Sequence, residues 1–178
     1  MKRLLIITVF LFATTFVNAQ DSYKLTVQDL NTDNAEIVGL HLCYFNMPHK
    51  EWSLGYSLRY DFITFSNNFT QNLFTNNPDF DSYEYYNVSL GCDFFCKLFW
   101  KFYLVTPMYI NIGSETLSSS SDGTSINDIF VGVSGDAMFT FIPDNYGITF
   151  GCGISGMYTS ATYYKSDFGF KFEVGLKF

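Results

Sequence analysis

The chain ends in FGFKFEVGLKF, residues 168–178, a stretch in which every second residue is large and apolar. Because successive side chains of a β-strand point to opposite faces, this alternation predicts a final strand with one apolar face. The members of that face are Phe168, Phe170, Phe172, Val174, Leu176 and Phe178. The other face carries small or charged residues, so the strand is expected to separate an apolar from a polar environment.

The opposite end of the chain, MKRLLIITVFLFATTFVNAQ, has the features of a secretory signal peptide. Two basic residues precede an apolar run over residues 4–16, and small residues up to Ala19 form a cleavage site. Gln20 in place of a cysteine argues against a lipoprotein. A retained N-terminal anchor is the alternative, and the shortness of the apolar run disfavours it. We therefore expect a signal peptide at residues 1–19 and one domain at residues 20–178.

The composition is unusual for a domain surrounded by water. Aromatic residues make up 20% of the chain and charged residues only 15%. Removal of the two basic residues of the signal peptide takes the formal charge from −7 to −9. Since no basic run remains, a nucleic-acid partner is not expected. The many aromatic side chains indicate an environment other than water.

Alternation with a period of two residues recurs along the chain, whereas helical periodicity is absent. The eight predicted strands fall at residues 23–30, 35–46, 51–64, 85–95, 101–113, 127–141, 147–155 and 168–178. Pro107 interrupts the fifth of them and predicts a β-bulge there. No turn residue marks the connection between the fourth and fifth strands.

Short and long connections alternate from the second strand onward, with the long ones at residues 65–82, 114–125 and 158–165. This arrangement is typical of outer-membrane barrels, which have short periplasmic turns and long outer loops. The sequence therefore predicts an all-β fold, an eight-stranded antiparallel up-and-down transmembrane β-barrel with both termini on the periplasmic side.

The apolar faces are too bulky to share the interior of an eight-stranded barrel, so we expect them to face lipid. The lumen would then hold Lys24, Glu51, Arg59, Asp61, Asp93, Lys101, Asp136, Lys171, Glu173 and Lys177. Because both signs are present, these residues are expected to form a polar plug rather than a channel. A narrow conduit for small solutes remains the alternative.

The signal peptide, the eight strands and the terminal FKFEVGLKF resemble the small outer-membrane β-barrel proteins of Gram-negative bacteria, a group that includes OmpX-like and OmpA-barrel-like proteins. The resemblance implies an outer-membrane location in the cell envelope. It also implies that the terminal strand is read by the assembly machinery. The corresponding assembly signal consists of Phe170, Phe172, Val174, Leu176 and Phe178.

The residues give little support to an enzyme. His41 is expected to face the lumen near Ser57, which would allow a Ser-His-acid arrangement with a nearby acid. A lipid-modifying enzyme of the lipid A class is therefore retained as an alternative. The four cysteines do not fall on neighbouring strands, so no disulfide is expected. Cys92, Cys96 and Cys152 are interpreted as small lipid-facing residues.

The long loops are the remaining candidates for function. The aromatic residues of residues 65–82 either form a binding surface or pack on the barrel rim, and residues 114–125 predict a flexible loop. We expect a non-enzymatic barrel with a structural or surface-binding role and no cofactor. The expected partners are outer-membrane lipid, the assembly machinery with periplasmic chaperones, and an extracellular ligand of the loops. The barrel itself is expected to be a monomer.

Overall fold

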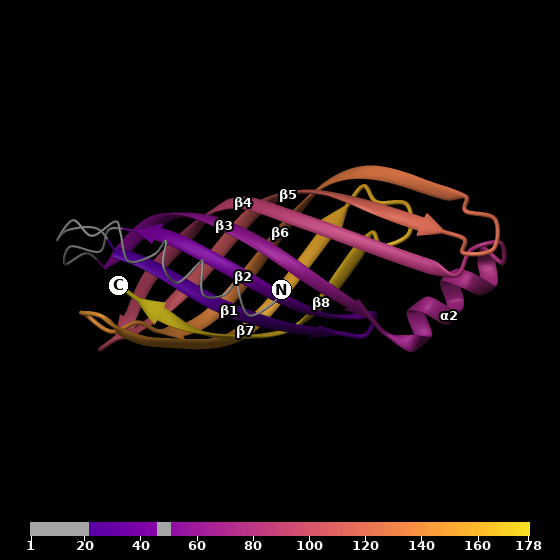
Figure 1. Ribbon diagram of the computed structural model, residues 1–178. Helices are drawn as coiled ribbons and strands as arrows, with labels where there is room; N and C mark the ends of the chain where they lie inside the picture. Colours follow the sequence, from indigo (N-terminus) through magenta and orange to yellow (C-terminus); the bar gives the residue numbers. More distant parts are fainter. Residues whose placement is uncertain (1–21, 46–50) are drawn as a thin grey trace.

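The chain forms a closed antiparallel barrel in which each strand pairs with its neighbour in sequence and β1 pairs with β8 (Figure 1). The computed structural model describes residues 22–45 and 51–178. Its elements are β1 (Ser22–Thr32), β2 (Ala35–Phe45), β3 (Trp52–Phe65), α2 (Asn67–Asn76), β4 (Ser82–Phe99), β5 (Phe102–Ser118), β6 (Ser125–Phe141), β7 (Gly147–Thr159) and β8 (Ser166–Lys177). The predicted eight-stranded up-and-down barrel is confirmed. The predicted signal peptide, residues 1–19, lies outside the described residues.

The two ends of the barrel differ. Helix α2 and the connections Asp33–Asn34, 119–124 and 160–165 lie at one end, which we call the helix end. The C-terminus and the connections 100–101 and 142–146 lie at the other, which we call the turn end (Figure 1). The connection between β1 and β2 is a two-residue turn, so the alternation of short and long connections does not extend to the first hairpin.

Strands β4, β5 and β6 are longer than the sequence pattern predicts. They contain 18, 17 and 17 residues, whereas about 9–11 residues suffice for a tilted strand to cross a bilayer. Their extra residues pair above the rest of the barrel, with Ser82 opposite Ser118 and Ser118 opposite Ser125. Much of the predicted flexible loop at 114–125 is therefore strand, and the connection itself spans only residues 119–124.

Helix α2 was not predicted, because it is short and rich in asparagine. Its start is capped by Ser66, whose side chain accepts a hydrogen bond from the backbone N–H of Phe69 at 3.3 Å. Phe69 stacks on Phe65 of β3, with ring centroids 4.8 Å apart, and Leu73 one turn further is buried. The aromatic loop thus packs on the barrel rim, which was one of the two alternatives considered. Among the described residues, no helix combines the length and apolar character that a membrane crossing would need.

The turn between β4 and β5 forms without the glycine, proline, asparagine or aspartate that usually marks a turn. Trp100 adopts a positive φ of 48°, a conformation that residues other than glycine rarely take, and the register shifts between Lys97 and Phe99. The predicted bulge at Pro107 is wrong. The register of β5 against both neighbours is the same before and after Pro107, so no extra residue is inserted. The pairing with β6 is interrupted at residues 106 and 107, since proline has no N–H to donate.

Candidate functional site

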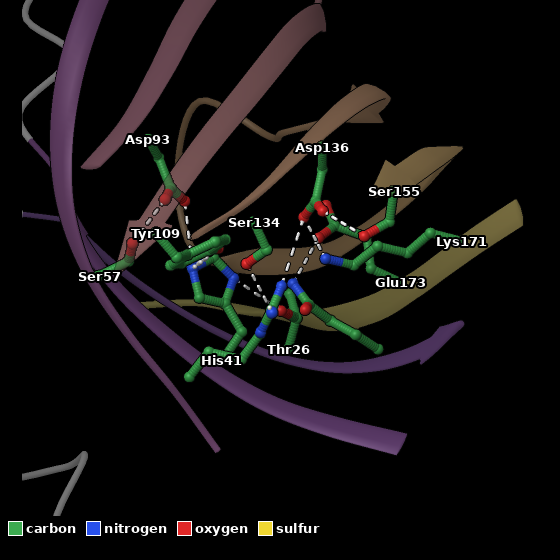
Figure 2. A network of polar contacts seen from close by, with 12 residues as sticks. Thr26, His41, Ser57, Asp93, Tyr109, Ser134, Asp136, Ser155, Lys171 and Glu173 are labelled. Carbon is green, nitrogen blue, oxygen red and sulfur yellow. Dashed lines mark hydrogen bonds and ion pairs between the residues drawn. The ribbon is translucent and has the colours of Figure 1, made fainter. Parts of the chain in front are cut away.

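The middle of the lumen contains a network of buried ion pairs (Figure 2). Arg59 of β3 lies 3.1 Å from Asp61 and 3.9 Å from Asp136 of β6, and it donates a hydrogen bond to Ser134 at 3.0 Å. Asp136 also accepts hydrogen bonds from Lys171 of β8 and, at 2.6 Å, from Ser155 of β7. Residues from four strands thus meet at one point, which links opposite walls of the barrel.

A second ion pair joins the strands that close the barrel. Lys24 of β1 donates to Glu173 of β8 at 2.9 Å, and both side chains are almost fully buried. Glu173 accepts a further hydrogen bond from Thr140 at 3.1 Å. Since each charge has a partner, the desolvation cost of burying it is offset.

His41 and Ser57 lie near each other, but not as a nucleophile and its base (Figure 2). Ser57 donates a hydrogen bond to Asp93 Oδ1 at 2.6 Å, and His41 Nε2 lies 3.2 Å from Asp93 Oδ2. The carboxylate therefore lies between the hydroxyl and the imidazole. In a Ser-His-acid triad the imidazole must contact the hydroxyl directly to accept its proton. The expected proximity is present, but the order of the three groups does not suit nucleophilic catalysis.

Most of the predicted lumen charges lie where the alternation placed them. The predicted lumen positions of two residues are wrong, because Glu51 is exposed and Lys101 is only half-buried. Both residues belong to connections at the turn end, where strand alternation no longer applies. Lys101 instead pairs with Asp144 at 3.3 Å near the surface.

Tyr109 and Glu115 were not identified from the sequence as residues of the lumen. Tyr109 of β5 is buried against His41 and under the guanidinium of Arg59, which lies 4.4 Å from its ring centroid. Glu115 accepts a hydrogen bond from Tyr83 at 2.6 Å and from the backbone of the 160–165 connection. The alternation predicted for residues 101–113 already places Tyr109 on the inward face, and its extension to residue 115 would have placed Glu115 there too.

Apolar clusters cover the polar network at both ends, which the prediction of a polar lumen did not anticipate. The helix-end cluster consists of Leu30, Ala35, Ile37, Tyr85, Phe130, Met157, Ala161 and Tyr164, with Ile63, Phe65, Phe69 and Tyr83 packed against it. The turn-end cluster consists of Cys43, Phe45, Phe95, Tyr103, Val105, Met138 and Ile142. Because both clusters draw on several strands around the barrel, they close the lumen like a protein core.

The outward face of the barrel is apolar, as predicted. Exposed side chains with large apolar area occur on every strand, among them Tyr56, Leu90, Ile110, Val133, Phe150 and Phe172. This face becomes polar on the extensions of β4, β5 and β6, where its members are Ser82, Glu84, Ser114, Thr116, Ser118, Ser125 and Asn127. The apolar band therefore ends below the top of the long strands.

The cysteines and the terminal strand agree with the predicted faces. All four cysteines are free, with Cys96 and Cys152 exposed on the outside, Cys92 partly exposed and Cys43 buried in the lumen. The assembly-signal residues of β8 form part of the outward face, since Phe170, Phe172, Val174 and Leu176 are exposed. Their role in assembly stays a prediction.

The surface of the helix end is acidic. It carries Asp33, Asp79, Asp81, Glu84, Asp122, Asp128 and Asp167. Among the described residues of this end, Lys165 is the one basic side chain. The pKa of Asp122 is lowered by hydrogen bonds from the backbone and hydroxyl of Thr124. This rim is therefore a negatively charged surface at neutral pH.

No protein-family model matches the chain, and a search of curated proteins finds no significant match. Among solved structures, the N-terminal β-barrel domain of OprF from Pseudomonas aeruginosa has a TM-score of 0.56 at 9% identity, over 89% of this chain and 98% of that domain. The attachment invasion locus protein Ail of Yersinia pestis has a TM-score of 0.54 at 14% identity, over 89% and 97% of the two chains. At these identities the comparisons establish the fold, which is that of small eight-stranded outer-membrane barrels.

Proposed function

We propose that this protein is a non-enzymatic outer-membrane barrel with a closed lumen, whose helix end presents a binding surface outside the cell. The closed lumen is the observation that carries the proposal. A polar layer held by ion pairs lies between two apolar clusters, so neither a substrate nor an ion finds a hydrated route through the barrel.

The outward face supports the membrane location. A continuous band of exposed aromatic and aliphatic side chains around a closed barrel would be unstable in water but is suited to lipid. Each strand is long enough to cross a bilayer, and closure leaves no unpaired strand edge within the band. The helix end then projects outside the cell and the turn end lies in the periplasm.

The extensions of β4, β5 and β6 support the role in binding. They raise a paired three-stranded sheet above the apolar band, with helix α2 beside it (Figure 1). Ail has been crystallised with the heparin analogue sucrose octasulfate. The acidic rim of the present chain disfavours such a polyanion and favours a cationic partner, such as a basic protein segment.

The terminal strand supports assembly by the outer-membrane machinery with periplasmic chaperones. Phe170, Phe172, Val174, Leu176 and Phe178 alternate along β8, and the same side chains would contact lipid after insertion. Strand β8 also closes the barrel by pairing with β1 from Lys24 opposite Lys177 to Thr32 opposite Gly169. We expect the barrel to act as a monomer, because the closed sheet needs no second copy.

Three measurements test the proposal. Purified protein in planar bilayers should give no stable conductance steps, and lipid A from a deletion strain should have an unchanged mass spectrum. Replacement of the rim acids Asp79, Asp122 and Asp128 by asparagine, singly and together, should weaken binding of cells to cationic surfaces while the barrel remains folded. Porin-like conductance or altered lipid A would refute the closed, non-enzymatic barrel, whereas unchanged binding would refute only the role of the rim.

A further inference from the structure

The boundary between the polar layer and the turn-end cluster contains a set of side chains suited to a transition metal. His41 and Cys43 are two residues apart on β2, so both point into the lumen. Asp93 of β4 reaches the same point from across β3. One ligand atom from each residue lies within 4.8 Å of the other two, and all three residues are buried.

The carboxylate of Asp93 has an unused oxygen at this point. Its Oδ1 accepts the hydrogen bond from Ser57, but Oδ2 is buried without a hydrogen-bond partner among the described residues. Oδ2 lies 3.2 Å from His41 Nε2, in a geometry that does not form a hydrogen bond. Its one ion-pair partner among the described residues is this imidazole, so with a neutral imidazole a bound cation would offset the cost of burying the carboxylate.

The surrounding contacts orient the side chains as in metal sites. His41 Nδ1 lies 3.3 Å from Thr26 Oγ1, so an Nδ1–H can donate to the hydroxyl and leave the lone pair on Nε2, where the Tyr109 hydroxyl is its hydrogen-bond partner in this structure. Ser57 donates a hydrogen bond to Oδ1, the other carboxylate oxygen of Asp93, and so orients the carboxylate. Such outer-shell hydrogen bonds fix the tautomer and direction of metal ligands. Tyr109, whose hydroxyl lies 3.2 Å from Nε2, is available for a water or for the fourth position.

The charge of the layer favours a divalent ion. Between the two apolar clusters the structure describes three buried bases, Lys24, Arg59 and Lys171, and four buried acids, Asp61, Asp93, Asp136 and Glu173. With a neutral imidazole the layer has a formal charge of −1. A divalent ion bound to a thiolate, with the thiol proton released to solvent, adds +1 and makes the layer neutral.

We propose that His41, Cys43 and Asp93 form a structural site for a transition-metal ion of the zinc class, which ties β2 to β4 inside the barrel. Sulfur, imidazole and carboxylate ligands together suit Zn²⁺. Tetrahedral bonds of about 2.0–2.3 Å would set the three ligand atoms about 3.3–3.6 Å apart, so the thiol needs to approach by at most about 1.5 Å. Since the lumen is closed at both ends, the ion enters while the barrel folds. This proposed metal site does not depend on the binding role proposed for the acidic rim.

Refolding of the full barrel in detergent with Zn²⁺, followed by extensive dialysis and elemental analysis, tests the site. We expect about one zinc per folded chain, and with Co²⁺ an absorption band from thiolate-to-cobalt charge transfer. Because loss of an outer-shell partner already weakens metal binding 10- to 100-fold, Cys43→Ser and His41→Gln should weaken it more than about 100-fold. Cys152→Ser is the matched control, since this thiol faces outward, and it should retain the ion.

A variant that keeps Cys43 as its sole cysteine covers the case in which Cys43→Ser does not fold. In this variant, the buried thiol should be alkylated more slowly in urea below the unfolding midpoint after refolding with Zn²⁺ than after refolding in a chelator, because the bound ion stabilises the folded barrel. No retained metal in the folded wild type, equal retention by Cys43→Ser, or equal alkylation with and without Zn²⁺ would overturn the proposal.

Discussion

Replacement of Arg59 by methionine should destabilise the barrel strongly, because the guanidinium neutralises acids on two walls of the lumen. Asp136 would keep Lys171 and Ser155, but Asp61 would keep only the hydrogen bond from Asn87 among the described residues. Leaving a buried charge without its partner typically costs 3–5 kcal/mol. We therefore expect the free energy of unfolding to fall by about 3–5 kcal/mol, which is about 100- to 4000-fold in the unfolding equilibrium constant.

Urea unfolding in lipid vesicles measures this change. Trp52 and Trp100 both lie exposed near the turn end, so their fluorescence should report the transfer from the membrane interface to water. The matched control is Lys101→Met, which breaks the exposed Lys101–Asp144 pair and should cost less than about 1 kcal/mol.

The double variant Arg59→Met with Asp61→Asn separates charge from packing. Since asparagine at position 61 leaves no unpaired charge, the double variant should be more stable than Arg59→Met alone, with a coupling of about 1–3 kcal/mol. An Arg59→Met barrel within about 1 kcal/mol of the wild type would refute the reasoning, because it would mean that water reaches and solvates the polar layer.

Three further variants probe other parts of the barrel. Phe130→Ala, which removes a ring with only 1% exposure from the helix-end cluster, should cost about 3–5 kcal/mol in urea unfolding without opening a conductance, since the polar layer and the turn-end cluster remain. The pKa of Tyr164 is raised above its ordinary value of 10.0 by burial and by its hydrogen bond to Asp167, so its contribution to stability is present below pH 10 and lost as the pH rises toward the folded pKa. Tyr164→Phe should therefore flatten the alkaline loss of stability, and an unchanged profile would contradict this. Deletion of Phe178 should reduce insertion in cells much more than Phe168→Ala, which removes an outward ring of the same strand. Equal effects of the two changes would contradict a role of Phe178 in assembly.

The strands and their faces could be predicted because lipid imposes one simple rule. Most outward-facing side chains of the band are apolar, with Asp29 beside Val38 and Phe172 as an exception, so the period of two residues survives along the band, as in residues 168–178. The same rule identified Cys92, Cys96 and Cys152 as outward, and the structure has Cys96 and Cys152 exposed and Cys92 exposed in part. Beyond the band the rule ends, and the prediction failed there: the extensions of β4 to β6 and helix α2 lie where both faces are polar or irregular.

The contacts of the lumen could not be predicted, because they join strands that are not neighbours or residues that are not register partners. Asp93 and His41 are separated by strand β3, and Lys24 contacts Glu173 although its register partner on β8 is Lys177. Such diagonal and cross-barrel contacts depend on the tilt of the strands, which alternation does not encode. The inward Phe45, Phe95 and Phe130 obey the alternation, but the volume argument for aromatic residues outside overlooked them.

The arrangement of the lumen also bears on where function can reside. A water-filled pore tolerates the loss of one charge, because water solvates the partner that remains. Here the apolar clusters exclude water from both ends of the ion-paired layer, so each buried charge depends on its protein partner. An interior built in this way acts as a core that fixes the positions of all eight strands. It therefore supports a rigid, acidic rim at the helix end, and the chemistry by which the protein meets a partner is expected there rather than inside the barrel.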